Sequence, residues 1–400
     1  MLRRLAVAYT VNELGNWLGT VALTVAVFYH THSAIATAAL FVSVRFVPAI
    51  VVTAGVAWLE SAGRRGTLAV LYSVQALTTG GLAVLVAHPV LAPILVLGAL
   101  DGAAALAARA LLRAVVSQEA GDDATRRRAN GNLNLGWATT AALGPAIGGV
   151  LTGALGATPV LLIDVASFAL TAALVLRVPT SRTDAARGGV LEQLRSARRY
   201  IAGDATLGWL LGTEAVALVF FAAVVPVEVI FAKATLRAGD GGYGALLAAW
   251  GAGMFFGSTI FARAGHRSLG ALLTVSTAAV AVAYLGVAAA GLLWIACVFC
   301  FVGGTGNGVQ WIALITAVQE RTPSALQGRL MGVVESMGAL CPAVGFALGG
   351  AVTAATHPRA TFAMAGIAAA VATFAFARLA VLGRAARATQ TDMGAGEPVG

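Results

Sequence analysis

The sequence contains 400 residues, of which 59% are apolar and only 11% are charged. Soluble domains typically carry about 25% charged residues and 45–50% apolar ones, so this chain lacks the polar residues that would cover a surface in water. The composition therefore excludes an ordinary soluble protein and indicates lipid as the solvent. The apolar segments fill most of the length and leave no room for a large soluble domain.

A transmembrane helix needs about 20 consecutive, mainly apolar residues. We predict an all-α integral membrane protein with transmembrane helices at 5–29, 34–58, 67–87, 91–115, 131–154, 158–177, 207–232, 244–263, 268–289, 292–317, 329–354 and 359–382. The first segment is interpreted as a retained helix and not as a signal peptide, because no small-residue cleavage site ends a short apolar core.

A polar stretch divides the chain near its middle. We predict an N-terminal six-helix bundle at 1–177, a linker at 178–206, a C-terminal six-helix bundle at 207–382 and a disordered cytoplasmic tail at 383–400. Apolar residues recur at helical spacing inside the linker, which predicts a short amphipathic helix. Such a helix either lies on the inner membrane surface or is solvated.

The net charge of +9 is interpreted as a topology signal, because cytoplasmic loops of membrane proteins are enriched in lysine and arginine. With the N-terminus inside, 22 of the 26 cationic residues fall on the cytoplasmic side and three on the outer side, while Arg45 lies within the second segment. This asymmetry predicts a multi-pass protein of the cell inner (cytoplasmic) membrane with both termini in the cytoplasm. The run Arg126–Arg128 is interpreted as a loop near anionic lipid and not as a nucleic-acid site.

Other chemistry has little support in the sequence. The three cysteines, Cys297, Cys300 and Cys341, lie in apolar runs and indicate small buried side chains, not a metal site or a disulfide framework. Lys233 is the only lysine and lacks the glycine-rich loop of a nucleotide-binding motif. Motifs of zinc proteases and serine hydrolases are missing. We therefore expect no cofactor, no metal, no ATP hydrolysis and no enzymatic activity.

The two halves of the chain show a weak internal repeat. Three short matches occur in one order at offsets of 202, 201 and 197 residues: 62–65 with 264–267, 116–119 with 317–320, and 145–148 with 342–345. A repeat of this kind predicts two pseudo-symmetric bundles. Parallel repeats in transporters place a substrate site at the bundle interface near the middle of the membrane.

Two motifs are similar to those of a known family. The loop after the second segment contains Glu60, Gly63, Arg64 and Arg65, similar to the pattern G-x-L-A-D-R-x-G-R-R, with Glu60 in place of the aspartate and Ser61 in place of the first arginine. The fifth segment matches an antiporter-type G-P-x-x-G-G pattern through Gly144, Pro145, Gly148 and Gly149. The chain resembles the major facilitator superfamily over its whole length. Further segments in the same order along the chain, 14–17, 45–48, 129–131, 244–257 and 328–332, are similar to the drug:proton antiporter branch that includes macrolide and enterobactin (siderophore) exporters.

Polar and charged residues within apolar segments are the candidates for function, because a charge at the bilayer centre costs roughly 2.5–3.5 kcal/mol on insertion scales. The candidates for proton coupling or substrate binding are Glu13, Asn16, Arg45, Asp101, Arg109, Asp164 and Glu214.

Glu13 and Asp101 are the leading candidates for proton coupling. Glu13 lies beside a polar stripe of Asn12, Asn16, Thr20 and Thr24, which is expected to face a central cavity. It either binds a proton or pairs with an arginine such as Arg45 or Arg109. Asp101 is expected to share a helix face with Arg109.

Three other acidic residues receive different interpretations. Asp164 is placed towards the outer end of its segment, where it could simply reach interfacial water. Glu214 is expected to face the cavity from the second bundle. Glu335 resembles the acidic partner that the family's loop motif engages in the outward-open state, and a local pair with Arg329 or access to water is the alternative.

The resemblance implies a secondary active transporter, most simply a proton-coupled exporter of small amphipathic compounds such as drugs, siderophores or metabolites. Its expected partners are the substrate, protons and membrane lipid, and it is expected to work as a monomer. The same fold would also serve an importer or a uniporter. A non-transporting membrane protein or a membrane enzyme is a further alternative from another class.

Overall fold

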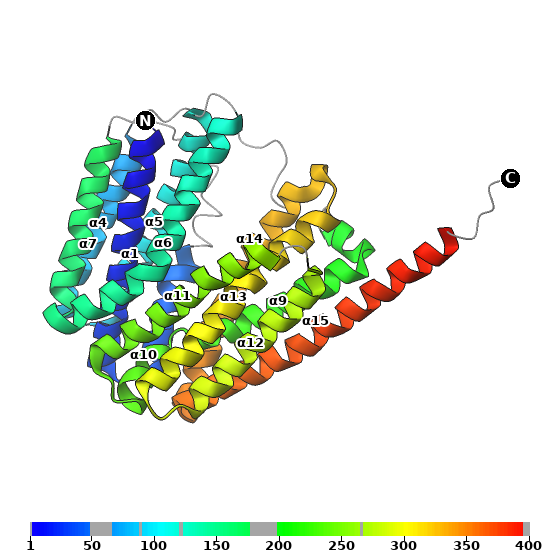
Figure 1. Ribbon diagram of the computed structural model, residues 1–400. Coiled ribbons are helices and arrows are strands. Elements are labelled where there is room, and N and C mark those ends of the chain that lie inside the picture. Colours follow the sequence, from blue (N-terminus) through cyan, green and yellow to red (C-terminus); the bar gives the residue numbers. More distant parts are fainter. Residues whose placement is uncertain are drawn as a thin grey trace.

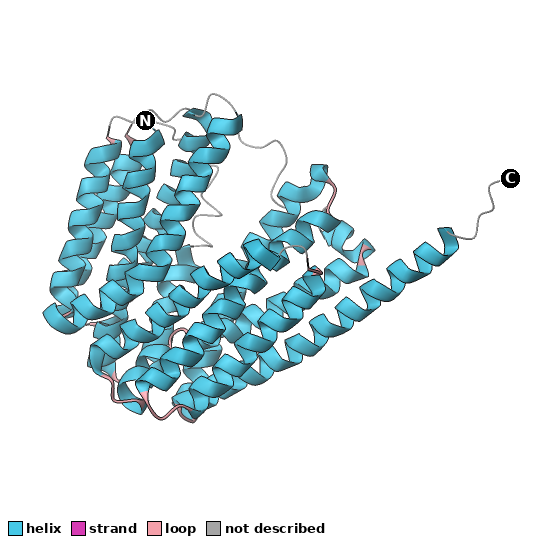
Figure 2. Ribbon diagram, viewed as in Figure 1, coloured by secondary structure: helices cyan, strands magenta, loops and turns pink. Residues whose placement is uncertain are grey.

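The computed structural model describes residues 2–48, 66–87, 90–119, 123–176, 198–264 and 267–394. All regular secondary structure within these ranges is helical (Figure 2). A helix satisfies its backbone hydrogen bonds internally, which a segment surrounded by lipid requires because no water is available there. The predicted all-helical architecture is confirmed.

The N-terminal bundle contains six helical crossings. Each lies within or overlaps a predicted segment, and α1, α5 and α6 extend past the apolar residues into polar ends; residues 49–58 of the second predicted segment lie outside the described residues. The elements are α1 (Leu2–Thr31), α2 (Ala34–Phe41) with its π-helical continuation η1 (Val42–Phe46), α4 (Thr67–Ala87), α5 (Leu91–Glu119), α6 (Asp123–Leu155) and α7 (Ala157–Val175).

The C-terminal bundle repeats this plan. Its first crossing is interrupted at Pro226, which lacks a backbone donor. The crossing consists of α9 (Ala205–Val224), α10 (Glu228–Ile230) and the π-helical η2 (Phe231–Thr235). The other crossings are α11 (Gly239–Ala264), α12 (Leu269–Ala289), α13 (Leu293–Arg321), α14 (Ser324–Ala355) and α15 (Pro358–Gly394).

Nine helices in the described ranges are long and apolar enough to cross a membrane by themselves. The other three crossings, α1, α2 with η1, and α6, are shorter in their apolar part or more polar. Many large apolar side chains are exposed on the helix surfaces, including Leu77, Val275 and Phe374, each exposed by 70% or more. Lipid is the solvent that such a surface requires.

The bundles meet at one end of the molecule and separate towards the other (Figure 1). Near the N-terminal end of α1, one apolar core holds only residues of the first bundle, such as Leu112 and Phe168, and a separate core holds only residues of the second, such as Leu314. At the opposite end, Val21 and Phe28 of α1 belong to the core of the second bundle. We call the end near the N-terminus of α1 the open end and the opposite end the closed end.

The structure can be compared with two predictions about polar segments, the C-terminal tail and the linker helix. α15 continues to Gly394, past residue 383 where the predicted tail begins, and the disorder of the tail stays a prediction. Ala and Arg, which recur in this stretch, have high helix propensity, and this favours the extension. The predicted linker helix lies largely outside the described residues, which resume at 198 with one helical turn that ends before Asp204.

Candidate functional site

The polar stripe of α1 is buried inside the protein. Asn12 and Thr24 are nearly inaccessible, and Asn16 donates a hydrogen bond of 3.2 Å from Nδ2 to Asn12 Oδ1. Thr20 and Thr24 each donate to the carbonyl four residues earlier, at 2.7 Å. These contacts satisfy the hydroxyls within the helix and leave the amide pair as the polar surface next to Glu13.

Glu13 pairs with Arg109 of α5. The distance from Arg109 Nη2 to Glu13 Oε1 is 3.0 Å, and the side chains are 4% and 34% exposed for Glu13 and Arg109 respectively. A carboxylate this deeply buried needs a charged or hydrogen-bonded partner. Of the two arginines proposed as partners, Arg109 forms the ion pair.

Arg45 completes this cluster from η1. Its side chain is exposed, and it interacts electrostatically with Arg109, Glu13 and Tyr243. Tyr243 belongs to α11 and forms a side-chain hydrogen bond with Thr24 of α1. We refer to Glu13, Arg45 and Arg109 as the charged cluster, which joins α1, η1 and α5 and reaches the second bundle through Tyr243.

Asp101 forms a separate hydrogen-bonded site on α5. Its Oδ1 accepts from the hydroxyl of Thr78 at 2.8 Å and from the hydroxyl of Thr79 at 3.1 Å, both on α4. The Asp101 carboxylate is thus stabilised by neutral hydroxyl donors, whereas the Glu13 carboxylate is stabilised by the cation of Arg109.

Asp164 of α7 is 3% exposed, so the interpretation that it reaches interfacial water is wrong. Its Oδ1 accepts from the Ser167 hydroxyl at 3.2 Å. The reason is the close packing of α1: any Cβ at Gly15 or Gly19 would overlap the Asp164 side chain. The two glycines let α1 cover this carboxylate. Asp164 also interacts electrostatically with Asp101, so the two carboxylates lie in one region of the bundle.

Glu214 lies in the second bundle on α9 and is 4% exposed. Its Oε2 accepts a hydrogen bond of 3.0 Å from Nε2 of Gln310 on α13. The acidic candidates therefore occupy three places: the charged cluster, the Asp101–Asp164 region, and the interior of the second bundle.

The glycine-proline segment of α6 provides two helix contacts. Gly144 packs against Trp17, and Gly148 against Leu18 and Val21 of α1, while Gly149 meets the backbone of Gly244 on α11. Small residues allow such close approach of helices in membranes. The segment thus packs α1 inside its own bundle and touches the other bundle at the closed end. Pro145 contributes its carbonyl oxygen to the same contact with Gly244.

The loop motif lies outside the described residues, and this includes Glu60, Gly63, Arg64 and Arg65. Glu335 lies on α14, but its side chain is also outside the described set. The proposed contact between them stays a prediction.

Sequence reasoning missed Glu228. Its Oε2 is buried, and no hydrogen-bond partner for that atom lies among the described residues. Glu228 interacts electrostatically with Tyr243 and Tyr284. The signal was present in the sequence, because Glu228 is an acidic residue inside the predicted segment 207–232, as Glu214 is.

Known proteins provide independent comparisons. The family model of the Major Facilitator Superfamily matches residues 5–345 and 242–398. A crystal structure of the nucleoside transporter NupG is 13% identical, with a TM-score of 0.66 and coverage of 94% of this chain and 98% of that chain. Among curated proteins, none matches the chain.

Two further solved structures have the same fold. A bacterial metal transporter is 15% identical, with a TM-score of 0.69 over 95% of this chain and 98% of its own. A bacterial homologue of the human lysosomal transporter Spinster, in an inward-facing and unoccupied conformation, is 14% identical, with a TM-score of 0.67 over 94% and 96%. Together with the family match, the twelve crossings in two bundles of six show that this chain belongs to the major facilitator superfamily of membrane transporters.

Proposed function

We propose that the chain is a proton-coupled exporter of small amphipathic molecules that works by alternating access between its two bundles. The ion pair between Glu13 and Arg109 is the observation that carries this proposal. Proton coupling needs a carboxylate that is ionised in one conformation and neutral in another. Glu13 is buried, yet its partner is one-third exposed, so the pair combines a desolvated acid with a cation that water and solutes can reach.

Protonation of Glu13 would change the charged cluster from one net positive charge to two, because Arg45 and Arg109 keep their charges. The helices that carry these groups also form the closed end. Val21 and Val25 of α1 enter the core of the second bundle, and Phe41 of α2 lies 5.4 Å from Phe346 of α14 between ring centroids. A charge change on these helices therefore acts where the bundles meet. A proton can shift the equilibrium between two conformations only if it binds one of them more tightly than the other.

The direction of transport is inferred from two features. The glycine-proline segment of α6, which resembles the antiporter pattern, forms part of the contact between bundles at the closed end. The arginine distribution favours cytoplasmic termini, which would make the open end face the cytoplasm. In this orientation, within a bacterial cytoplasmic membrane, the protein collects its substrate from inside the cell.

The test of coupling uses purified protein in lipid vesicles with an imposed pH gradient. A substrate is first chosen by resistance profiling of cells that express the chain. Wild-type protein is expected to drive substrate against its concentration when the gradient is imposed and to stop when an ionophore collapses it. Glu13→Gln should lose gradient-driven transport but still exchange labelled for unlabelled substrate. Glu320→Gln, which changes an exposed carboxylate at the end of α13, is the matched control and should behave as wild type.

Other outcomes would overturn the proposal. Wild-type flux that ignores the gradient would indicate a uniporter, and accumulation along with protons would indicate an importer. Full gradient-driven transport by Glu13→Gln would remove Glu13 from the coupling step.

Orientation has its own test. His30→Cys places a thiol at the closed end, and Arg267→Cys places one at the open end; both original side chains are exposed. In intact cells, a membrane-impermeant thiol reagent should label the first variant and not the second. The reverse pattern would place the termini outside and reverse the direction inferred here.

A further inference from the structure

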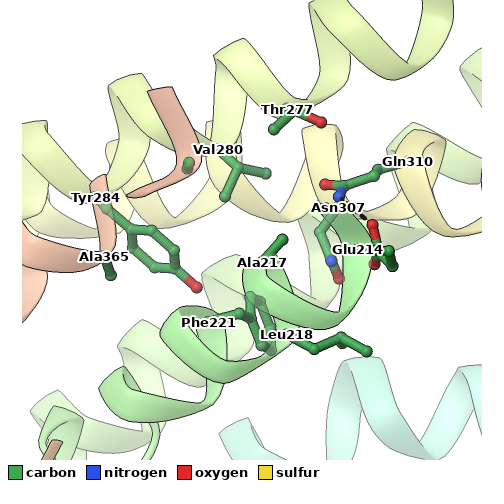
Figure 3. Close-up of a pocket in the computed structure, with 11 residues that line it drawn as sticks. Glu214, Ala217, Leu218, Phe221, Thr277, Val280, Tyr284, Asn307, Gln310 and Ala365 are labelled. Atoms are coloured by element: carbon green, nitrogen blue, oxygen red, sulfur yellow. Dashed lines mark hydrogen bonds between the residues drawn. The ribbon is translucent and has the colours of Figure 1, made fainter. Parts of the chain in front are cut away.

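The second bundle encloses a small cavity of about 30 Å³, whose lining is largely apolar with a few polar side chains. Its polar lining comes from Glu214 of α9, Thr277 and Tyr284 of α12, and Asn307 and Gln310 of α13 (Figure 3). A cavity needs about 10–15 Å³ of such volume to hold one water molecule. The space is therefore large enough for a single ion or for about two to three waters.

Among the described residues that line this cavity, Glu214 is the only acidic one. One hydrogen bond, from Gln310 Nε2, reaches its Oε2 at 3.0 Å. In the described part of the chain, no arginine, lysine or histidine forms an ion pair with it. An ionised carboxylate in a low-dielectric interior is strongly unfavourable unless a positive charge compensates it. The cavity is therefore short of one positive charge whenever Glu214 is ionised.

Thr277 supplies an independent observation. It is 1% exposed, and its Oγ1 has no hydrogen-bond partner among the described residues. Other threonines nearby donate to the carbonyl four residues earlier, as Thr274 does to Gly270 at 2.7 Å and Thr316 does to Ile312 at 2.8 Å. Thr277 does not form this bond, although the residue lines the cavity (Figure 3). A buried hydroxyl without a partner costs roughly 1–3 kcal/mol, so a bound species in the cavity would remove that cost.

The glycine run of α13 explains how the amides reach this position. Gly304 and Gly308 pack against the backbone of α11, so closely that a Cβ at either would overlap Trp250 or Met254. Asn307 and Gln310 are three residues apart and therefore share a face of α13, which is the face that borders the cavity. The same helix thus carries a packing face without side chains and a face with two amides.

We propose that this cavity binds one sodium ion. Its ligands would be a carboxylate oxygen of Glu214, the hydroxyl oxygen of Thr277 and the side-chain carbonyl oxygens of Asn307 and Gln310. Hard cations prefer oxygen ligands of these kinds. A monovalent ion balances the single carboxylate, whereas a divalent ion would leave an uncompensated positive charge inside the bundle. This site is in the other bundle from Glu13, so it does not depend on the proposed proton coupling.

Binding is tested first by thermal unfolding of the full-length protein in detergent. Sodium chloride is compared with choline chloride and potassium chloride at equal ionic strength. A ligand that binds only the folded state raises the midpoint of unfolding. Wild-type protein should show a rise in Tm that saturates with sodium and is smaller with potassium. Equal Tm values in sodium and choline would overturn the proposal.

Variants then assign the site, with direct binding of radioactive sodium as the second measurement. Glu214→Gln should abolish the sodium effect, and Thr277→Val should raise the half-saturating sodium concentration by about tenfold or more. Thr277→Ser keeps the hydroxyl and should restore binding, which separates loss of a ligand from misfolding. Sodium binding that survives in both Glu214→Gln and Thr277→Val would exclude this cavity.

The outcomes also separate this proposal from the previous one. Glu13→Gln is expected to lose gradient-driven transport and keep its sodium response. A stabilisation that depends on pH and on Glu214 but not on sodium would make the cavity a proton site and would overturn the sodium proposal.

Discussion

Gly149 of α6 and Gly244 of α11 lie backbone against backbone, so no side chain separates the two bundles at this crossing. The contact belongs to the closed end, where Phe41 and Phe346 also meet from opposite bundles. A carrier that alternates its access has to break these contacts and form them again in every cycle. Because neither glycine has a side chain, α6 and α11 can approach closely at this contact, and no interlocking side chains oppose their separation.

Adding one methyl group at this crossing should keep the closed end from closing. In Gly149→Ala, the new Cβ would overlap Gly244, so the bundles must move apart. We expect slower transport and faster labelling of an Ala38→Cys thiol, which lies on the buried face of α2 at the closed end. Rates of labelling by a water-soluble thiol reagent measure the effect.

Gly212→Ala is the matched control for this change. A Cβ at Gly212 meets no other atom within 4 Å, and alanine is intrinsically better in a helix than glycine by about 1 kcal/mol. This variant should transport as wild type does and be slightly more stable. If both variants behaved alike, the contact between Gly149 and Gly244 would have no role in closure.

A crosslink across the closed end should stop the cycle. Ala38 of α2 and Gly350 of α14 face each other from opposite bundles. After Cys297, Cys300 and Cys341 are replaced by alanine, the pair Ala38→Cys and Gly350→Cys should form a disulfide with a mild oxidant. Transport should stop on oxidation and return on reduction. A protease site inserted between residues 183 and 190 allows the crosslink to be seen as two halves that stay joined on a gel.

The control for the crosslink pairs Ala38→Cys with Gly338→Cys, on the same helix α14. A Cβ at Gly338 meets no atom within 4 Å, so no disulfide should form. Crosslinking of this pair as well would show that the closed end opens widely in the resting protein. A crosslinked Ala38–Gly350 pair with unchanged transport would contradict alternating access at this contact.

The ion pair between Glu13 and Arg109 should contribute measurably to stability. Removing one partner leaves the other buried or partly buried without its counter-charge, and this is more destabilising than removing both. Glu13→Gln and Arg109→Gln should each lower the stability of the protein in detergent. The double variant should lose less than the sum of the two, with a coupling of about 0.5–3 kcal/mol. Additive losses would mean that Glu13 and Arg109 are not energetically coupled.

Asp204 combines two interactions that a pair of substitutions can separate. Its Oδ1 accepts from the backbone N–H of Leu207 at 3.1 Å and caps α9, while Oδ2 lies 3.5 Å from Arg321 Nη1. The cap is worth about 1 kcal/mol, whereas a partly exposed ion pair contributes about 0–1 kcal/mol. Asp204→Ala should therefore lower Tm more than Asp204→Asn, which keeps the cap. An equal loss in both variants would assign the stability to the ion pair.

The sequence was sufficient to predict the twelve crossings, because a continuous apolar run leaves the backbone no alternative to helix in lipid. The importance of Glu13 also followed from the cost of burying a charge and from the polar stripe beside it. Its partner did not follow, because Arg45 and Arg109 are both long cationic side chains and only the packing of α1 against α5 selects one of them.

The errors have a common physical origin. Asp164 was placed near interfacial water from its position along the segment, but its burial depends on which face of α7 meets Gly15 and Gly19 of α1. The Oε2 atom of Glu228 is buried although the residue lies close to the end of its crossing. Depth along a helix can be counted in a sequence, whereas the direction in which a side chain points depends on partners that are distant in the chain.

The position of Val21, Val25 and Phe28 in the core of the second bundle bears on how the protein is made. These side chains leave the ribosome long before Phe231, Tyr243 and Phe362, which share that core with them. During synthesis the closed-end part of α1 therefore stays incompletely packed in lipid until α15 inserts and supplies Phe362. The first helix to enter the bilayer is accordingly among the last to finish folding, and a nascent chain interrupted before its final crossing would be a substrate for membrane quality control.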